Sequence, residues 1–408
     1  MDFGQLASYQ LTDEDLVWMQ AFDGQSLSSL QGAVLSQSDP HRRMLLEQVI
    51  RRLKVNDKWP FLKNHPSYFL PPGINLEQSS SEFTARYKSD LFHGDRFLDL
   101  TGGMGMDAFW ISRHFKRGVL VEPNQELAER TASNLKLLGA GHLHVYAGVS
   151  AEDWLGMNSD QFDLIYLDPS RRTDQGKKVF KLEEYTPRVD LLLNELMPRC
   201  QTIAFKTSPL LDIQSVIQLL PQISAVHILT VHQECRELLF VIQKNARPGI
   251  RLVCASYESD GWRQLTFTKD EEAALDVETD WPRRYLYEPN ASIMKSGMFK
   301  LLTQKYGTPQ LHPHTHLFTS DQLHHDFPGR IFQVDAILKV NVKEVQHYLP
   351  DRKANLSLRN FPGKQADLKK ILRIADGGDQ YLWACILQDA SKRLLLCKKI
   401  NPDLQGQD

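Results

Sequence analysis

The chain carries the sequence DLTGGMGMD at residues 99–107, between a short apolar segment that ends in Asp99 and a segment with helical spacing. Glycine lets the backbone turn tightly and approach a ligand without a Cβ atom in the way. The free amide groups at the start of the following helix favour an electron-rich group. Strand, glycine turn and helix in this order therefore predict a ligand-binding turn. Its candidate contacts are Thr101, Gly102, Gly103 and Gly105.

Short apolar segments alternate with helical segments over about residues 97–207. Such alternation predicts a parallel sheet covered by helices. Two further apolar segments, VHILTVHQE and RELLFVIQK, are separated by too few residues for a crossover helix, so they must pair as an antiparallel hairpin. We therefore expect an α/β fold with a terminal antiparallel hairpin, a helical N-terminal region and C-terminal α+β modules.

Glu122 ends the second predicted strand, GVLVEP, where a carboxylate can accept both hydroxyls of a ribose. Residues 103–108 also fit the dinucleotide pattern G-x-G-x-x-A, so an NAD-dependent oxidoreductase is an alternative. Asp99 argues against this alternative, because a carboxylate four residues before Gly103 suits a cationic amine rather than a pyrophosphate. The terminal hairpin is also unusual for a dinucleotide fold.

The motif DLIYLDPSRR, at residues 163–172, places Asp168 at the carboxyl end of the fourth strand. Ligands bind at this end of the strands in such sheets. Asp168 can orient a nucleophile, while Arg171 and Arg172 can clamp a phosphate or stack on a base. An acid that caps a turn, followed by two solvated arginines, is the structural alternative.

Over about residues 80–245 the sequence resembles class I methyltransferases, whose sheet is Rossmann-like. The resemblance implies S-adenosylmethionine as the cofactor, with Asp99 contacting its methionine part and Glu122-Pro123 binding its ribose. The motif at Asp168-Pro169 resembles the D-P-P-Y/F motif of enzymes that methylate amino groups on bases. It departs from that motif because Ser170 and Arg171 replace the second proline and the aromatic residue. We take Asp168, Pro169 and Arg171 as candidate catalytic residues and Arg172 as a substrate contact.

Two other segments are expected near this site. Arg86 or Lys88 can cover the carboxylate of the cofactor, although Ser79 and Glu82 resemble the capping box of a plain surface helix. Lys206 ends the fifth strand and either faces the substrate or is an exposed lysine.

Histidines alternate at His312, His314 and His316, which predicts that all three share one strand face. Alternating histidines can bind zinc. No flanking cysteine or acid completes a site, so we predict no metal.

The composition restricts the remaining possibilities. The length of 408 residues indicates several domains, and the net charge is -2. The five cysteines are scattered, which is typical of a protein in a reducing cytoplasm. No signal peptide or apolar stretch of membrane-spanning length is present. We therefore expect a cytoplasmic protein without a membrane partner, and the sequence leaves its oligomeric state open.

Residues 340–400 contain 12 Lys and Arg against 6 Asp and Glu, a local net charge of +6. Such a patch suits a phosphate backbone, although a solvated helix with mixed charge is the competing interpretation. The candidate substrate contacts in this region are Arg352, Lys353 and Arg359.

The order of segments resembles a bacterial group of RNA methyltransferases that carry ferredoxin-like and THUMP-like domains. The segment YLYEPNASIMKSG indicates the former domain and RKANLSLRNFPGKQADLKK the latter. Because THUMP domains generally present RNA to a fused enzyme, the resemblance implies RNA, transfer or ribosomal, as the substrate. A non-catalytic RNA-binding protein with a vestigial methyltransferase fold is the other alternative. The expected domains are 1–77 (helical), 78–247 (methyltransferase), 248–331 (ferredoxin-like) and 332–408 (THUMP-like).

Overall fold

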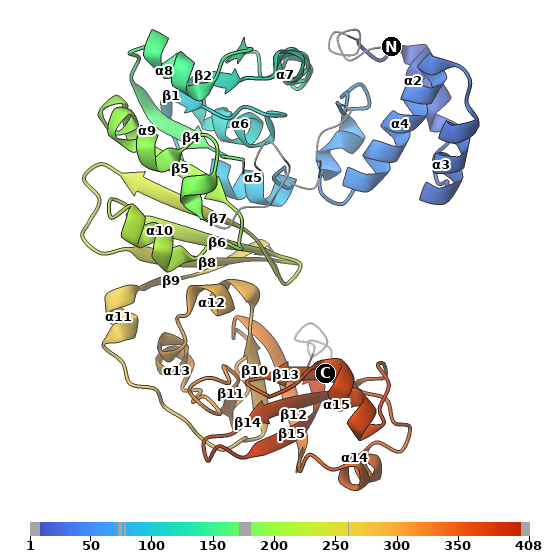
Figure 1. The fold of residues 1–408 in the computed structure, drawn as a ribbon, viewed down its shortest axis with the longest axis vertical. Helices are drawn as coiled ribbons and strands as arrows, with labels where there is room; N and C mark the ends of the chain where they lie inside the picture. The colour runs from blue at the N-terminus through green and yellow to red at the C-terminus, as the bar shows by residue number, and fades with distance from the viewer. Residues whose placement is uncertain (1–8, 72–75, 77–78, 171–180, 260, 401–408) are drawn as a thin grey trace. The chain divides into compact units, whose positions relative to one another are not determined.

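The structure, a computed structural model, describes residues 9–71, 76, 79–170, 181–259 and 261–400 (Figure 1). The chain divides into two compact units. The first unit comprises residues 1–226 and 237–247, and the second comprises residues 227–236 and 248–408. The first unit contains the predicted parallel sheet.

The first unit begins with helices that start at side-chain caps. Thr12 and Asp15 form a capping box, and Ser26 and Asp39 cap the next two helices. Each cap satisfies amide groups that have no partner within the helix. The predicted helical N-terminal region is therefore confirmed. Its elements are α2 (Asp13–Gln20), α3 (Leu27–Ser36), α4 (Pro40–Val55) and the 3-10 helix η1 (Pro60–Asn64).

Two buried amide side chains tie this helical region to the residues that follow it. Gln48 on α4 exchanges hydrogen bonds with the backbone of Leu70 (2.8 and 2.9 Å). Asn134 does the same with the backbone of Phe69 (3.2 and 2.9 Å). Because Asn134 lies on helix α7 (Gln125–Leu137), the helical region is held directly to the sheet domain.

The strands of the first unit lie in the order β3-β2-β1-β4-β5-β7. Strands β1 to β5 are parallel, and β7 runs antiparallel to β5. This order confirms the predicted parallel sheet with a reversed strand at its end. The strands are β1 (Gly94–Asp99), β2 (Phe115–Glu122), β3 (Leu143–Ala147), β4 (Phe162–Leu167), β5 (Cys200–Thr207) and β7 (Glu234–Gln243), while most of β6 (Ala225–Val231) belongs to the second unit.

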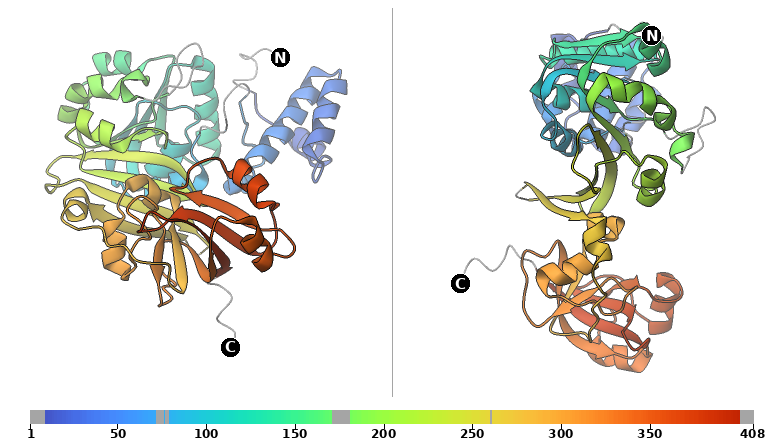
Figure 2. Two further views of the ribbon diagram at one scale, coloured as in Figure 1. Left: turned by 60° about the horizontal axis from the view of Figure 1, so that its bottom comes forward. Right: turned by 90° about the vertical axis from the view of Figure 1, so that its left-hand side faces the viewer.

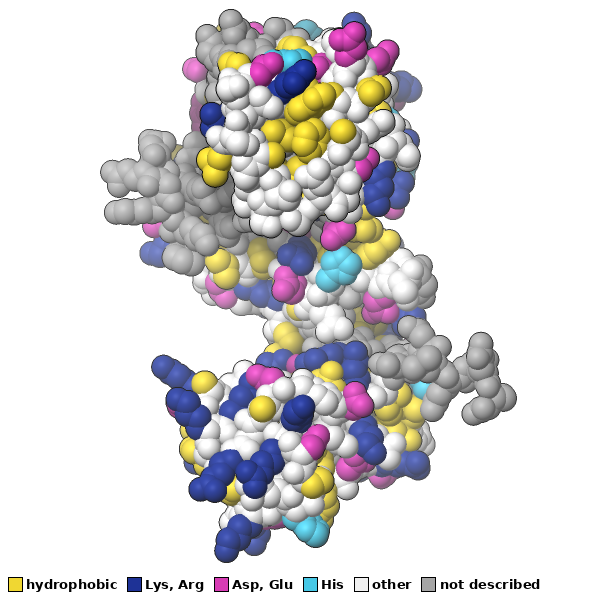
Figure 3. All heavy atoms as spheres, turned by 90° about the vertical axis from the view of Figure 1, so that its right-hand side faces the viewer, with side chains coloured by type: hydrophobic (Ala, Val, Ile, Leu, Met, Phe, Trp, Pro, Cys, Tyr) yellow, Lys and Arg dark blue, Asp and Glu magenta, His cyan; other side chains and the backbone are white. Residues whose placement is uncertain are grey.

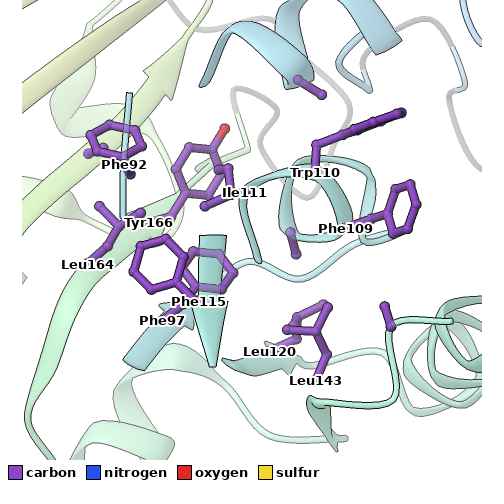
Figure 4. Close-up of a cluster of buried hydrophobic side chains, with 14 of the residues drawn as sticks. Phe92, Phe97, Phe109, Trp110, Ile111, Phe115, Leu120, Leu143, Leu164 and Tyr166 are labelled. Carbon is purple, nitrogen blue, oxygen red and sulfur yellow. The ribbon is translucent and has the colours of Figure 1, made fainter. Parts of the chain in front are cut away.

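Helices pack on this sheet through an aromatic-rich core, part of which Figure 4 shows. Phe97 on β1 and Tyr166 on β4 are fully buried there, and Phe109 and Trp110 on helix α6 are nearly so. Burying each such side chain contributes about 1.5–3 kcal/mol. This core fixes the strand ends at which the site lies. The helices are α5 (Glu82–Ser89), α6 (Met106–Ile111), α7, α8 (Ala151–Met157), α9 (Val189–Leu196) and α10 (Ile213–Leu219), with the 3-10 helices η2 (Ser112–His114), η3 (Leu182–Glu184) and η4 (Met197–Arg199).

The second unit contains the antiparallel hairpin β8–β9 and a six-stranded sheet, drawn in orange to red in Figure 2. The strand order of this sheet is β11-β10-β12-β15-β14-β13. Two apolar clusters form around the six-stranded sheet, one with Trp383 and one with Leu368 on helix α15. Within the described residues, no helix of the chain is long and apolar enough to cross a lipid bilayer.

The second unit alternates short helices with strands along the chain. They are β8 (Arg251–Glu258), β9 (Gly261–Thr268), α11 (Lys269–Ala273), β10 (Tyr285–Pro289), α12 (Ala291–Ser296), α13 (Lys300–Tyr306), β11 (Phe318–Ser320), β12 (Gly329–Leu338), α14 (Val342–Tyr348), β13 (Asn355–Arg359), α15 (Gln365–Leu372), β14 (Gln380–Ile386) and β15 (Lys392–Ile400).

The predicted capping box of Ser79 and Glu82 is wrong. The N-cap of α5 is Ser81, whose side chain accepts a hydrogen bond from the N–H of Thr84 (3.2 Å). Glu82 is the first residue of the helix, and its carboxylate accepts the N–H of Phe61 (2.9 Å) instead. Glu82 therefore helps to hold the N-terminal region rather than the helix end.

The predicted strand face of three histidines is also wrong. His312 and His314 lie in a turn, in which the N–H of Thr315 donates to the carbonyl of His312 (3.0 Å). His316 follows the turn and stacks on Phe299, with ring centroids 3.9 Å apart. Among the described residues, no group of three or more His, Cys, Asp or Glu is arranged to hold a metal ion.

Candidate active site

Asp99 ends β1 and is almost fully buried, with 2% of its surface exposed. Its Oδ1 accepts hydrogen bonds from the N–H (2.8 Å) and the hydroxyl (3.1 Å) of Thr101. Burial raises the pKa of Asp99 to about 7 against the opposing effect of Thr101, and the carboxylates of Asp107 and Asp168 raise it as well. Opposite charge favours the ionised form of such a group, so Asp99 is suited to a cationic ligand.

Glu122 ends β2 and is positioned by the glycine turn. Its Oε2 accepts the N–H of Gly103 (2.9 Å), and its Oε1 accepts the N–H of Asn124 (2.9 Å). Burial raises the pKa of Glu122, although both hydrogen bonds lower it. Each carboxylate oxygen has a second lone pair, so Glu122 can still accept hydrogen bonds from hydroxyl groups.

The turn between Asp99 and α6 requires glycine at two positions. Gly105 has a φ of +72°, and a Cβ there would lie 3.0 Å from Cγ2 of Thr131. A Cβ at Gly102 would lie 3.3 Å from both Cβ of Leu120 and the carbonyl oxygen of Val121. A side chain at either position would force these neighbouring atoms to shift by a few tenths of an ångström, and at Gly105 it would also strain the backbone.

Thr101 connects the glycine turn to β4. Its hydroxyl donates to Asp99 and accepts the backbone N–H of Asp168 (2.6 Å). Asp168 directly follows β4, which lies beside β1 in the sheet. A single hydroxyl group therefore links the carboxylate of Asp99 to the backbone of Asp168, the two predicted acids at the ends of these adjacent strands.

Lys206 is buried near the end of β5 and forms an ion pair with Asp168, whose Oδ2 lies 2.7 Å from Nζ. The alternative of an exposed lysine is therefore wrong. Burial raises the pKa of Asp168, and Asp107 also raises it, whereas Lys206 lowers it. Lys206 thus keeps Asp168 in its ionised form more readily than burial alone would allow.

A buried ion-pair network lies behind these residues, and the sequence did not predict it. Lys88 on α5 is fully buried and contacts Oδ1 of Asp107 (2.8 Å) and Oε1 of Glu237 on β7 (2.7 Å). Asp107 Oδ2 accepts hydrogen bonds from the hydroxyls of Ser80 (2.8 Å) and Tyr166 (2.7 Å). Although burial opposes it, Lys88 helps to lower the pKa of Asp107 to about 2.

The sequence did contain two signals for this network. Glu237 is a lone acid in the apolar run ELLFVIQ, and an acid in a buried strand requires a partner. Asp107 follows the glycine turn in the first helical turn, which directs it towards the strand ends. Neither signal identifies Lys88 as the partner, because Lys88 lies on α5, ahead of the first strand.

Other predicted residues lie at the edges of this arrangement. Arg86 is exposed on α5, where its guanidinium lies 4.5 Å from the ring centroid of Trp110 and 3.5 Å from Glu82. Pro123 is exposed after β2, and Pro169 is buried after Asp168. Arg171 and Arg172 lie outside the described residues.

The predicted basic residues of the second unit occupy opposite ends of β13. Arg352 and Lys353 are exposed ahead of the strand, whereas Arg359 ends it and pairs with Glu288 on β10 (2.6 Å). Figure 3 shows Lys and Arg side chains gathered over part of this unit. On or near α14 and α15, Lys343, Lys364 and Lys370 are exposed and Lys369 is partly exposed.

The site at the strand ends can therefore hold a cation at Asp99, accept hydroxyl groups at Glu122 and accept a donor at Asp168. Comparison with protein families and solved structures agrees with this geometry. Residues 82–187 match the family described as conserved hypothetical protein 95, residues 285–328 a ferredoxin-like domain, and residues 329–399 a THUMP domain-like family. No curated protein matches the chain.

One solved structure is similar over nearly the whole chain. It is described as a putative methyltransferase from Porphyromonas gingivalis W83, with 28% identity and a TM-score of 0.82, covering 95% of this chain and 98% of that one. A putative methyltransferase from Escherichia coli, yhhF, is 17% identical, with a TM-score of 0.31 and coverage of 44% and 92%. TrmK of M. capricolum, in complex with S-adenosylhomocysteine, is 10% identical, with a TM-score of 0.30 and coverage of 40% and 69%.

The fold and the family matches define the class of this protein as a methyltransferase. In particular, the chain is a methyltransferase that carries ferredoxin-like and THUMP-like domains, like the Porphyromonas gingivalis protein in its overall architecture.

Proposed function

We propose that this protein transfers a methyl group from S-adenosylmethionine to RNA in the cytoplasm. The observation that carries the proposal is the position of Asp99 and Glu122, which end the adjacent strands β1 and β2 next to the glycine turn. S-adenosylmethionine supplies an activated methyl group on a sulfonium, so the protein needs to bind and align the reactants rather than activate the donor.

The residues of the site fit this cofactor in charge and in hydrogen-bonding capacity. Three buried or partly buried carboxylates share two lysines and a fourth, that of Asp99, pairs with neither, so acidic groups outnumber basic ones. These groups are Asp99, Asp107, Asp168 and Glu237 with Lys88 and Lys206. A cationic ligand compensates this excess, and Asp99 is positioned for the ammonium of the methionine part. Glu122 is suited to the ribose hydroxyls, and we propose that the turn containing Gly102, Gly103 and Gly105 lies beneath the cofactor.

Asp168 is the proposed acceptor-site residue, with Pro169 beside it. An ionised carboxylate accepts a hydrogen bond from an N–H of the target and so orients its lone pair towards the methyl group. Lys206 is a positioning residue, because it acts on the target through Asp168. We retain Arg171 as a candidate catalytic residue and Arg172 as a candidate substrate contact.

RNA as the acceptor is supported by the second unit. Its THUMP domain-like segment and the excess of basic side chains over residues 340–400 both suit a phosphate backbone. We propose that Arg352, Lys353 and Arg359 contribute to RNA binding, and that the substrate is a transfer or ribosomal RNA. Residues 1–77, 78–247, 248–331 and 332–408 remain the proposed domain limits.

The test is the transfer of radiolabelled methyl groups from S-adenosylmethionine to total RNA from a bacterial strain that lacks the gene, followed by nucleoside analysis. We expect one labelled nucleoside with the wild type, and a loss of roughly 100-fold or more in rate with Asp168→Asn. Asp160→Asn, which changes an exposed carboxylate paired with Arg96 (2.7 Å), is the matched control. Absence of labelling by the wild type would contradict the proposal, and calorimetric binding of NAD instead of S-adenosylmethionine would support an oxidoreductase.

A further inference from the structure

Three charged side chains of the second unit meet at one end of the apolar face that contains Trp383. Glu288 on β10 is buried, with 6% of its surface exposed. Nε of Arg330 on β12 donates a hydrogen bond to its Oε2, and Nη2 of Arg359 donates to its Oε1 (2.6 Å). One carboxylate is thus shared by two arginines that come from different strands.

Trp383 on β14 fixes the position of both arginines. The indole is fully buried, and the guanidinium carbons of Arg330 and Arg359 lie 5.7 and 5.9 Å from its ring centroid. A guanidinium is attracted to an aromatic face at this range, and an ordered guanidinium loses less entropy when it binds a ligand. Both side chains remain about one-third exposed, at 28% and 33%, so a ligand can reach them.

The cluster has more donors and more positive charge than its described partners use. Glu288 is the only carboxylate paired with Arg330 or Arg359 among the described residues, which leaves one positive charge uncompensated. Nε of Arg359 is buried and donates to no residue in the described part of the chain. A buried donor without an acceptor is unfavourable, so the described residues do not fully satisfy the guanidinium of Arg359.

The histidine turn adds a further donor beside Arg359. Nδ1 of His312 lies 3.1 Å from the backbone N–H of His314 and accepts its hydrogen bond, which leaves the proton of a neutral ring on Nε2. The side chain of Asn360, the residue after Arg359, lies 3.3 Å from the same Nδ1. Burial lowers the pKa of His316, and His314, Arg359 and His312 lower it further, which agrees with an excess of positive charge here.

We propose that Arg330, Arg359 and His312 form a binding site for one phosphate group of an RNA backbone. The planar forks of two guanidinium groups match the oxygens of a phosphate, and an imidazole N–H supplies a further donor. Trp383 is fully buried and cannot stack on a base, so the site recognises phosphate rather than sequence. The assignment of this phosphate to RNA rests on the proposed function. The capacity of the site to bind a phosphate does not depend on that function.

The experiment measures the binding of a fluorescent single-stranded RNA of roughly 12 nucleotides by anisotropy, in the full-length protein. Arg359→Gln removes one charge but leaves Glu288 paired with Arg330, so the fold should persist, which thermal unfolding checks. Lys305→Gln is the matched control, because Lys305 is exposed on α13 in the same unit, outside the basic residues 340–400, and carries the same charge. We expect Arg359→Gln to weaken binding by about tenfold or more and Lys305→Gln by about twofold or less.

Equal weakening by the two variants would overturn the proposal, because it would show only general electrostatic attraction. Arg359→Lys, which retains the charge but lacks the fork, should restore only part of the affinity. Inorganic phosphate serves as a competitor and as a ligand on its own. If the wild type binds phosphate but not the RNA, the assignment to an RNA backbone is overturned. If Arg359→Gln selectively loses RNA binding while the wild type transfers no methyl group, the site stands and the proposed function fails.

Discussion

The raised pKa of Asp99 predicts that the affinity for the cofactor depends on pH. Its carboxyl group has a pKa of about 7 in the protein without ligand. Binding of the ammonium group requires the ionised form, so the affinity should increase as the pH rises through 7 and level off above it. At pH 5.5 about 3% of the group is ionised, so Kd for S-adenosylhomocysteine should be about 30-fold higher than at pH 8.

Isothermal titration calorimetry across this pH range checks the prediction. Asp99→Asn preserves an oxygen that accepts both hydrogen bonds from Thr101 but removes the charge. We expect this variant to bind about 10- to 100-fold more weakly at pH 8 and to lose the part of the pH dependence centred near 7. Asp95→Asn is the matched control, because Asp95 lies on the same strand but pairs with Lys116 at the surface (2.8 Å). Its Kd should change less than about twofold.

The stability of the protein without cofactor gives a second measurement of the same group. An acid whose pKa is higher in the folded state binds more protons when folded, so its stabilising contribution is present at low pH and lost as the pH rises through 7. The shift of Asp99 from 3.8 to about 7 corresponds to on the order of 4 kcal/mol. The free energy of unfolding of the wild type, measured by urea denaturation, should therefore fall relative to that of Asp99→Asn between pH 4 and pH 7. A wild-type Kd that is independent of pH, or an Asp99→Asn variant that keeps the dependence near pH 7, would refute this reasoning.

Three further predictions concern single residues of the site. Lys88→Met leaves Glu237 buried without its cation and should reduce the free energy of unfolding by about 3–5 kcal/mol at pH 8; a loss under about 1 kcal/mol in urea would contradict it. Glu122→Gln should weaken binding of S-adenosylhomocysteine by about tenfold in calorimetry, since the ribose hydroxyls lose a charged acceptor; an unchanged Kd would exclude the ribose contact. Lys206→Met removes the group that lowers the pKa of Asp168, so the acid limb of the kcat profile should move to higher pH. An acid limb that stays in place would rule out control of Asp168 by Lys206.

Most of the first unit could be predicted from the sequence because its signals are local. Buried strands appear as short apolar runs, and amphipathic helices separate them, so the parallel sheet follows from alternation alone. The reversed β7 was predictable for the same reason, since the connection between residues 231 and 234 is too short for a crossover. Asp99, Glu122 and Asp168 could be located because each follows a strand that ends at the same edge of the sheet.

The remaining contacts depend on residues that are far apart in the chain. The partners of Lys88 come from α6 and β7, so its burial has no local signature. The prediction that three histidines share a strand face failed because it rested only on their alternation in the sequence. Pro313 occupies the second position of the turn that begins at His312, and proline there favours a β-turn over a strand.

The ion pair between Lys88 and Glu237 joins residues 149 positions apart and has a consequence for biosynthesis. A ribosome adds roughly 5–20 residues per second, so Lys88 emerges about 7 to 30 seconds before its second acidic partner. During that interval the nascent chain holds Lys88 and Asp107 without the strand that completes their enclosure. Strand β7, the last of the sheet strands of this domain to be translated, thus supplies the carboxylate that completes the buried ion-pair network.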